Sequence, residues 1–228
     1  MRDSGDRIIR FNVFERVVHW IVALSFIVTA LTGMGLYMPG LFWLTGIFGG
    51  GAASRWLHPW AGVVFAASLV VMALMWARHM VLDSQDMAWL RRVGAYIAHR
   101  PGVPEAGRFN AGQKLLFWLV ILLGAVEFVT GLFMWSPDLY GGTTALRISY
   151  PVHSLAAAGY IALFILHVYM GTIALPGTFE TMTHGRITRT WARVHHPRWY
   201  RQVVAREQAD AAVPSAGVDV GAAARPRR

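Results

Sequence analysis

The stretch that decides the fold is residues 150–175, YPVHSLAAAGYIALFILHVYMGTIAL, an apolar run that carries two histidines and no other charged or titratable side chain except tyrosine. His153 and His167 lie fourteen residues apart, which at 100° per residue returns to within about 40° of one helical face and rises about 21 Å. A run of this length suits a hydrocarbon core about 30 Å thick. We therefore expect a membrane helix with two imidazoles on one side, one near each surface.

Three further apolar runs, at about 17–38, 58–77 and 115–135, have the same character. Hydrophobic residues make up 55% of the 228 residues and charged residues only 14%, a balance too apolar for an ordinary soluble domain. The sequence thus predicts an all-α integral membrane protein, a four-helix bundle over residues 1–205. The Ala/Gly/Pro-rich residues 206–228 are expected to be a disordered tail, and we find no internal repeat.

The basic residues are concentrated in alternate segments between the predicted helices. Arginines precede the first run, six Arg or Lys residues lie between the second and third runs, and nine arginines follow the fourth. The loops 39–57 and 136–149 carry only Arg55 and Arg147. By the positive-inside rule both termini and the middle loop are cytoplasmic, and the other two loops face outward. This distribution explains the net charge of +9 without nucleic acid as a partner.

Four histidines lie in or at the edge of the apolar runs, where an imidazole without a partner is costly. Depth selects the pairs. His58 opens the second helix on the outer side and pairs with His153 (the outer pair), whereas His19 opens the first helix on the inner side and pairs with His167 (the inner pair). Two bis-histidine sites, each the size for one haem b, are the result. Because two axial imidazoles leave no open iron position, they indicate electron transfer rather than oxygen activation.

Two other interpretations apply to histidines in a membrane. A single membrane histidine more often makes an interhelical hydrogen bond, but four at two matched depths favour ligation. A metal transporter would supply acidic or sulfur ligands at the same level, and few such groups exist here. The absence of cysteine excludes cysteine-bound iron–sulfur clusters and covalent haem. Glu127, inside the third apolar run, is interpreted as a hydrogen-bonded acid without an assigned role.

Six stretches make the sequence resemble the gamma (cytochrome b556) subunits of membrane-bound respiratory formate dehydrogenases. They are RFNVFERVVHW at 10–20, LHPWAG at 57–62, RFNAGQKLLFW at 108–118, PVHSLAAAGY at 151–160, LHVYMG at 166–171 and RTWARVHHPRWYR at 189–201. The resemblance implies the same four haem-iron ligands, His19, His58, His153 and His167. It also implies a quinone site at Asn110, Gly112 and Gln113, whose amides suit a quinone carbonyl but also suit a helix cap.

By the same resemblance, formate is oxidised on a molybdenum- or tungsten-containing alpha subunit, and electrons arrive through an iron–sulfur beta subunit. This chain would be the electron-transfer and quinone-reducing subunit of the enzyme complex, in the bacterial inner membrane. Two alternatives remain open here. One is the di-haem b subunit of a membrane hydrogenase or another quinone-linked oxidoreductase, and the other is a haem-free anchor or metal transporter with structural histidines.

Overall fold

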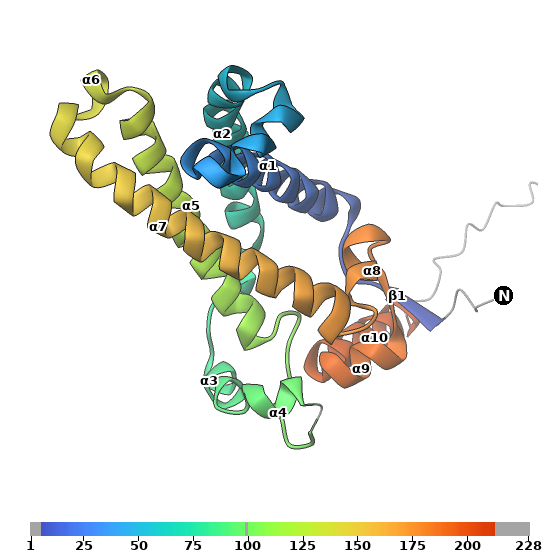
Figure 1. Cartoon of the computed structure of the whole chain (residues 1–228). Helices are drawn as coiled ribbons and strands as arrows, with labels where there is room; N and C mark the ends of the chain where they lie inside the picture. The colour runs from blue at the N-terminus through green and yellow to red at the C-terminus, as the bar shows by residue number, and fades with distance from the viewer. Residues whose placement is uncertain (1–5, 99, 213–228) are drawn as a thin grey trace, which may run out of the picture.

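The computed structural model describes residues 6–98 and 100–212 and contains four long helices, shown in Figure 1. They are α1 (Val13–Tyr37), α2 (Gly51–Trp76), α5 (Ala111–Trp135) and α7 (Gly142–Tyr169). The 3-10 turn η3 (Ala77–His79) extends α2, and the π-helical turn η4 (Met170–Ala174) extends α7. All four are long and apolar enough to cross a membrane, which confirms the predicted membrane helices.

Each long helix begins before the apolar run that predicted it. Asn12 caps α1 and Asn110 caps α5, and in both cases the third helical residue, Glu15 or Gln113, returns a hydrogen bond to the cap. These capping boxes place the first turn in polar sequence, so α1 starts at 13 rather than 17 and α5 at 111 rather than 115. Hydropathy indicates which residues lie in the hydrocarbon core, whereas the capping residues determine where each helix begins.

The four helices are arranged as two hairpins. α1 packs along α2, α5 packs along α7, and α2 and α5 make the main contact between the hairpins (Figure 1). The buried core at that contact includes Phe65, Leu69 and Phe117. Gly124 of α5 faces Leu69, and a Cβ at this position would overlap that side chain. Glycine is therefore what allows α2 and α5 to approach so closely.

The two hairpins are related by an internal repeat, contrary to our expectation that the sequence has none. α1 and α5 have the same length, 25 residues, and begin 98 residues apart. At that offset the segments share Arg-Phe-Asn before the helix, a tryptophan eight positions after the asparagine, Thr-Gly near the far end and a proline after it. The matched residues are Arg10/Arg108, Phe11/Phe109, Asn12/Asn110, Trp20/Trp118, Val22/Val120, Leu24/Leu122, Val28/Val126, Thr32/Thr130, Gly33/Gly131 and Pro39/Pro137.

Contacts between repeat-related residues indicate an approximate two-fold relation. The Arg10 guanidinium donates to the Arg108 carbonyl at 3.0 Å, and Arg108 donates back to the Arg10 carbonyl at 3.1 Å. The rings of Phe11 and Phe109 lie beside them with centroids 5.9 Å apart. Because α1 and α5 both start from this point, the pseudo-axis runs along the bundle, and the halves are parallel rather than inverted copies.

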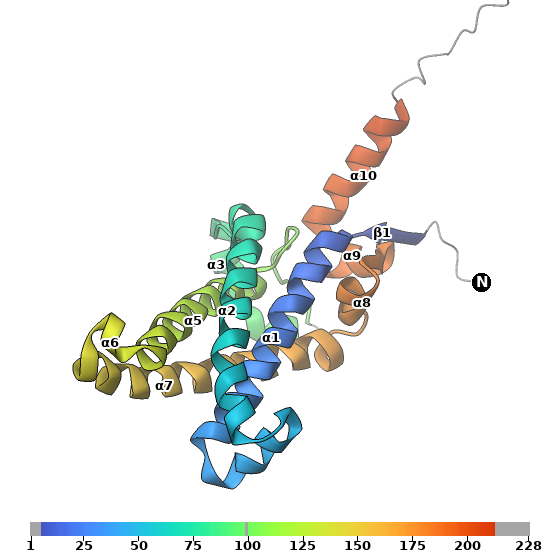
Figure 2. The same cartoon turned by 90° about the horizontal axis from the view of Figure 1, so that it is seen from above.

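The chain before α1 and after α7 closes this end of the bundle, called here the basic end. β1 (Arg7–Ile9) pairs antiparallel with β2 (Arg186–Thr188), so that Ile8 faces Ile187. α8 (Thr178–Thr183) precedes β2, and α9 (Arg189–His195) and α10 (Pro197–Ala212) follow it. In Figure 2 these segments lie together near the start of α1, and α10 projects away from the bundle.

Buried His196 joins three parts of the chain at the basic end. Its Nδ1 lies 2.7 Å from the Gly107 carbonyl and its Nε2 lies 2.9 Å from the Arg10 guanidinium. A guanidinium only donates and a carbonyl only accepts, so the imidazole is neutral with its proton on Nδ1. Burial and the neighbouring Arg10 hold the pKa of His196 well below its ordinary value. Burial also lowers the pKa of Arg10 to about 9, with Arg108 adding to the effect.

Short helices complete the connections: η2 (Pro39–Phe48), α3 (Ser84–Leu90), α4 (Val93–Ile97) and α6 (Pro137–Tyr140). α3 is held to the start of α5 by a buried ion pair, with Lys114 Nζ 2.6 Å from Asp86 Oδ2. Lys114 also donates to the Val81 carbonyl at 2.9 Å. The loop between α2 and α5 is therefore held to the start of α5 by two hydrogen bonds from one buried lysine.

The expected boundary of the tail is corrected by α10, which continues past residue 206 to Ala212. The sequence Val204–Ala212 is rich in Ala, Arg, Glu and Gln, which are strong helix formers, and its composition was mistaken for that of a disordered segment. Arg189 pairs with Glu207 at 2.8 Å and ties this part of α10 back to α9. The remainder of the predicted tail, 213–228, lies outside the described residues.

Candidate functional site

The outer pair meets across the contact between the hairpins. His58 of α2 and His153 of α7 face each other with ring centroids 6.3 Å apart and ring planes inclined by 73°. The two histidines occupy equivalent places in the repeat, since each follows its Thr-Gly motif by a similar interval, 26 residues for His58 and 23 for His153. The pseudo-axis therefore passes between them.

A threonine from the neighbouring helix holds each outer histidine. Thr32 Oγ1 lies 2.9 Å from His58 Nδ1, and Thr130 Oγ1 lies 2.9 Å from His153 Nδ1. Both hydroxyls donate their single proton to the carbonyl four residues earlier, of Val28 and Val126, at 2.6 Å. The threonine oxygen is thus left as an acceptor for Nδ1–H, which leaves Nε2 of each imidazole as the unprotonated nitrogen.

Glycine makes room for these imidazoles. A Cβ on Gly33 would lie 3.0 Å from Cε1 of His58, and a Cβ on Gly131 would lie 3.5 Å from Cε1 of His153. In each Thr-Gly pair the threonine therefore orients the imidazole, and the glycine allows that imidazole to approach the helix backbone. This role was not predicted, although repetition of the motif at an interval of 98 was a signal available in the sequence.

His153 has one contact that His58 lacks. Oε2 of Glu127, one turn before Thr130 on α5, lies 3.0 Å from His153 Nδ1. Glu127 is largely buried, and its other carboxyl oxygen, Oε1, is buried without a hydrogen-bond partner among the described residues. A hydrogen bond was expected for this acid from its place in the sequence, and the structure identifies the partner as a histidine of the outer pair.

The inner pair joins the two hairpins at the other level of the bundle. His19 of α1 and His167 of α7 have ring centroids 6.0 Å apart, with ring planes inclined by 55°. Nδ1 of His19 is buried and has no hydrogen-bond partner within the described part of the chain. The indole of Trp20, next to His19, donates to the Met182 carbonyl at 2.9 Å, which fixes the start of α1 against α8.

An aromatic layer separates the two histidine levels. Tyr160 lies midway between His153 and His167 on α7, stacks on Phe26 at 4.5 Å and meets the edge of Phe65 at 5.6 Å. Phe164 also packs on Phe26, with centroids 5.1 Å apart. These side chains link α1, α2 and α7 at mid-height. The structure thus brings together both predicted pairs and stacks them with an apolar layer between.

The spacing of both pairs fits a bis-imidazole metal centre. An iron bonded to one nitrogen on each face, at the roughly 2 Å typical of metal–imidazole bonds, would place the ring centres about 6 Å apart. The observed centroid distances are 6.0 and 6.3 Å. Open space lies beside Gly62 and Gly171, each one turn after a candidate ligand, where an added Cβ would meet no other atom within 4 Å. The residues present therefore fit haem at two levels.

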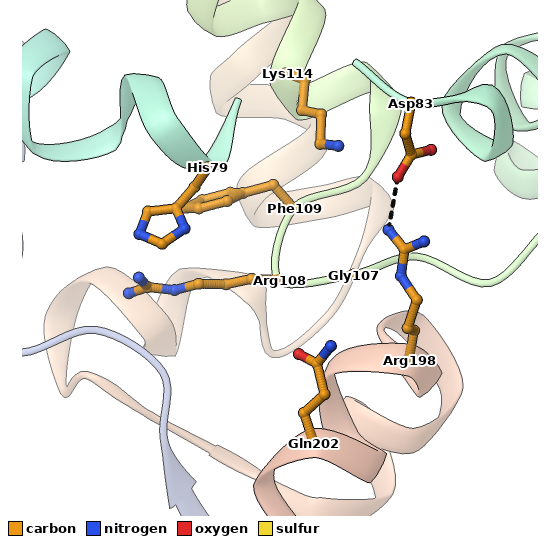
Figure 3. Close-up of a pocket in the computed structure, with 8 residues that line it drawn as sticks. All are labelled: His79, Asp83, Gly107, Arg108, Phe109, Lys114, Arg198 and Gln202. Carbon is orange, nitrogen blue, oxygen red and sulfur yellow. Dashed lines mark hydrogen bonds and ion pairs between the residues drawn. The ribbon is translucent and has the colours of Figure 1, made fainter. Parts of the chain in front are cut away.

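A polar hollow of about 350 Å³ lies at the basic end, beside the start of α5 (Figure 3). Figure 3 shows Arg198 and Gln202 of α10 entering from one side and Lys114 and Asp83 from the other, with Arg198 paired to Asp83 at 3.1 Å. Its remaining lining residues are His79, Gly107, Arg108 and Phe109. The hollow was not predicted from the sequence, because its walls come from segments far apart in the chain.

The three residues expected at a quinone site adjoin the hollow but do not line it. Asn110 is buried, and Asn110 and Gln113 use their side-chain oxygens for the capping box of α5, each accepting a backbone N–H of the other. Gly112 faces Trp89 of α3, where a Cβ would lie 3.4 Å from the indole. The helix-cap interpretation of the two amides is therefore confirmed, and the side chain of Asn110 also makes a hydrogen bond with Tyr96.

Known proteins with similar sequences point to one family. Two Escherichia coli (strain K12) proteins, the formate dehydrogenase cytochrome b556(fdo) subunit and its nitrate-inducible cytochrome b556(Fdn) counterpart, are 34% and 33% identical to this chain. The alignments cover 87% and 86% of the chain and 94% and 91% of the relatives. The formate dehydrogenase cytochrome b556 subunit of Haemophilus influenzae (strain ATCC 51907 / DSM 11121 / KW20 / Rd) is 32% identical over 88% of the chain and 85% of its own length.

The family model for prokaryotic cytochrome b561 matches residues 10–185, a stretch that contains all four membrane helices and both histidine pairs. The absence of cysteine agrees with this match, because a cytochrome b holds its haem non-covalently. By this match and by its relatives, the chain belongs to the prokaryotic cytochrome b561 family of membrane cytochromes b.

Proposed function

We propose that this chain is the di-haem cytochrome b subunit of a formate dehydrogenase, which takes electrons from an iron–sulfur subunit and passes them through two haems b to a membrane quinone. His58 and His153 would hold the outer haem, and His19 and His167 the inner one. The observation that carries the proposal is the pair of imidazole gaps, 6.3 and 6.0 Å between centroids, stacked along α7.

The protein's own contribution at each haem is orientation and exclusion of water. Bound haem b supplies one-electron transfer, with its potential set by its axial ligands and surroundings. Thr32 and Thr130 keep Nε2 of the outer histidines free of a proton and directed between the helices. The layer of Phe26, Phe65 and Tyr160 keeps the space between the levels apolar. These contacts are already formed in the protein, so the site is preorganised for electron transfer.

The quinone would be reduced at the basic end, close to the inner pair. In support of this place, Asn110, Gly112 and Gln113 lie at the start of α5, beside a polar hollow lined by His79 and Lys114. Amide donors suit a quinone carbonyl, and a hollow open to the aqueous side suits proton uptake. Two protons taken from that side, with electrons entering from the opposite side, would move charge across the membrane.

The proposed partners follow from what this chain lacks. It contains no cysteine, so an iron–sulfur cluster held by thiolates must belong to another subunit. The three relatives named above are all called subunits of formate dehydrogenase, which favours that enzyme over a membrane hydrogenase. An iron–sulfur beta subunit would dock at the outer end, and formate would be oxidised on a molybdenum- or tungsten-containing alpha subunit.

The proposed location is the bacterial inner membrane with both termini cytoplasmic. Because β1 pairs with β2, the N-terminal and C-terminal segments lie at the same end of the bundle, together with the loop after α2. That end is also the arginine-rich one, which the positive-inside rule assigns to the cytoplasm. A reporter fused after Arg228 should therefore report a cytoplasmic position, and a periplasmic signal would invert the topology.

The decisive experiment is haem analysis of the complex purified from its native membrane. We expect two haems b per copy of this chain, both reduced when formate is added and reoxidised by an added quinone. Reduction by hydrogen but not by formate would instead assign the chain to a hydrogenase. A preparation without iron porphyrin would overturn the proposal and leave a structural role for the histidines.

A further inference from the structure

The two ligands proposed for the outer haem are held differently, although the internal repeat makes their helices equivalent. Thr32 and Thr130 hold His58 and His153 in the same way, at the same distance of 2.9 Å. The difference lies one turn earlier. Position 127 on α5 is a glutamate, and the equivalent position on α1, 98 residues before it, is Thr29.

We propose that Glu127 is a positioning residue that makes the two axial ligands of the outer haem inequivalent, by giving His153 a carboxyl oxygen as a second acceptor for its Nδ1–H. This inference rests on the proposed function, because it takes His153 as a ligand. It concerns the bond from Glu127 Oε2 to His153 Nδ1, 3.0 Å long, and the Thr130 hydroxyl at 2.9 Å shares the same proton.

The α1–α2 half shows what the site would be without the glutamate. The Thr29 hydroxyl donates to the Phe26 carbonyl at 2.8 Å. Among the described residues, the oxygens that His58 is shown to contact are both neutral, the Thr32 hydroxyl and the Thr29 backbone carbonyl. Since the threonine and the glycine beside each histidine are the same in the two halves, the contact with Glu127 is an addition on the His153 side.

The burial of Glu127 argues that this contact serves more than packing. Its side chain is only 17% exposed, and Oε1 has no partner among the described residues. A buried polar oxygen without a hydrogen bond typically costs about 1–3 kcal/mol, so an apolar side chain of similar size would pack here with less penalty. The oxygen that does find a partner is the one that contacts a haem-ligand candidate.

The chemical consequence concerns the electron density at Nε2 of His153. When a metal-bound imidazole donates its other N–H to a carboxyl group, its orientation is fixed and it becomes a more basic ligand. A more basic axial ligand favours the oxidised iron, which carries the additional positive charge. Glu127 should therefore lower the midpoint potential of the outer haem and leave the inner haem, about fourteen residues away along α7, unchanged.

The test is a spectroscopic redox titration of the purified complex with variants at position 127. Glu127→Leu removes the acceptor, and Glu127→Gln keeps a neutral one. We expect both haems to remain bound and the outer-haem potential to rise, more in Glu127→Leu than in Glu127→Gln. Glu127→Thr installs the residue that α1 carries at this place, and it serves if leucine prevents haem insertion. In variants whose outer-haem potential rises, the low-spin ferric electron paramagnetic resonance signal of that haem should also shift.

Asp138→Asn is the matched control, because it removes an exposed carboxyl group near the same end of α5 without touching either histidine. We expect it to leave both potentials unchanged. Two bound haems with the outer potential unaltered in Glu127→Gln, Glu127→Leu and Glu127→Thr would overturn the inference while the proposed function stands. Absence of haem from the parent complex would overturn the proposed function itself.

Discussion

The two hairpins of this protein match at one level of the bundle and differ at the other. His58 and His153 correspond in the repeat, so the outer pair lies on the pseudo-axis. The inner pair does not repeat: the equivalent of His19 is Phe117, 98 residues later, and the equivalent of His167 is Met72, 95 residues earlier. Phe117 and Met72 are both buried in the core.

The difference follows from how the two contacts between the hairpins pack. Where α2 meets α5, Gly124 admits Leu69 and the helices approach closely, and the apolar side chains of Phe117 and Met72 are buried there. Where α1 meets α7, Phe26 and Tyr160 stack between the helices. The two contacts are equivalent in the repeat, but only the contact of α1 with α7 carries the inner pair.

The largest expected effect comes from removing a ligand of the symmetric pair. His153→Ala should lower the haem content of the purified complex from two per chain to one, and His58→Ala should give the same spectrum, because either change leaves the outer iron with one axial imidazole. A pyridine haemochrome assay measures the content. His19→Ala is the comparison and should remove the other haem. Identical spectra for His19→Ala and His153→Ala would show that the pairs are wrongly assigned.

The next prediction compares the basic side chains at equivalent places in α1 and α5. Lys114→Met leaves Asp86 buried without its cation, and breaking a buried pair in this way typically costs about 3–5 kcal/mol. Arg16→Met removes one charged hydrogen bond, to the Thr183 carbonyl at 2.6 Å, at about 1.5–3 kcal/mol. Thermal unfolding in detergent should therefore give the lower Tm for Lys114→Met, and the reverse order would contradict the assigned ion pair.

Comparison of the two helix caps distinguishes a structural role of the asparagine from a role in quinone reduction. Asn12→Ala and Asn110→Ala should each destabilise the protein by about 1 kcal/mol, because each removes one side of a capping box. Only Asn110→Ala should also slow quinone reduction at unchanged haem content. Stopped-flow reoxidation of the reduced haems by quinone provides the measurement. If both variants turn over quinone at the parental rate, the residues of the 110–113 segment are caps alone.

The smallest effect is expected from the threonines of the Thr-Gly motifs. Thr32→Val removes the hydroxyl that holds His58, whereas Thr130→Val leaves His153 with Glu127 as an acceptor. One hydrogen bond of about 1 kcal/mol is involved, so Thr32→Val should weaken outer-haem retention several-fold and Thr130→Val less. Serine at either position should restore retention. Equal losses in the two valine variants would show that Glu127 does not support His153.

Much of the fold and of the histidine geometry could be predicted because the signals are local. Apolar runs long enough to span a bilayer identified the four helices, and fourteen residues between His153 and His167 fixed their shared face and separation. The depth argument then paired each with its partner, and the structure places His58 beside His153 and His19 beside His167. Their role as haem ligands stays a prediction for the experiments above.

The repeat was missed because its signal lies outside the property that found the helices. Its identities are scattered over the caps, the Thr-Gly pairs, one proline and a few apolar positions such as Trp20/Trp118, whereas most residues between them differ, as His19 and Phe117 do. Averaged hydropathy therefore shows two similar helices and no duplication. The contact of Glu127 with His153 was missed for another reason: it depends on the rotation of α5 about its axis, which a lone acid in an apolar run does not fix.

The closure of the basic end has a consequence for biosynthesis. Ile8 meets Ile187 in the strand pair, and Arg10 meets His196 across 186 residues of chain. Until translation has delivered those late residues, the nascent polypeptide has all four hydrophobic segments but no seal over the entrance to the bundle. The strand pair around Ile8 can therefore form only after β2 has been synthesised, and a truncation just ahead of residue 186 would leave Arg10 without its imidazole acceptor.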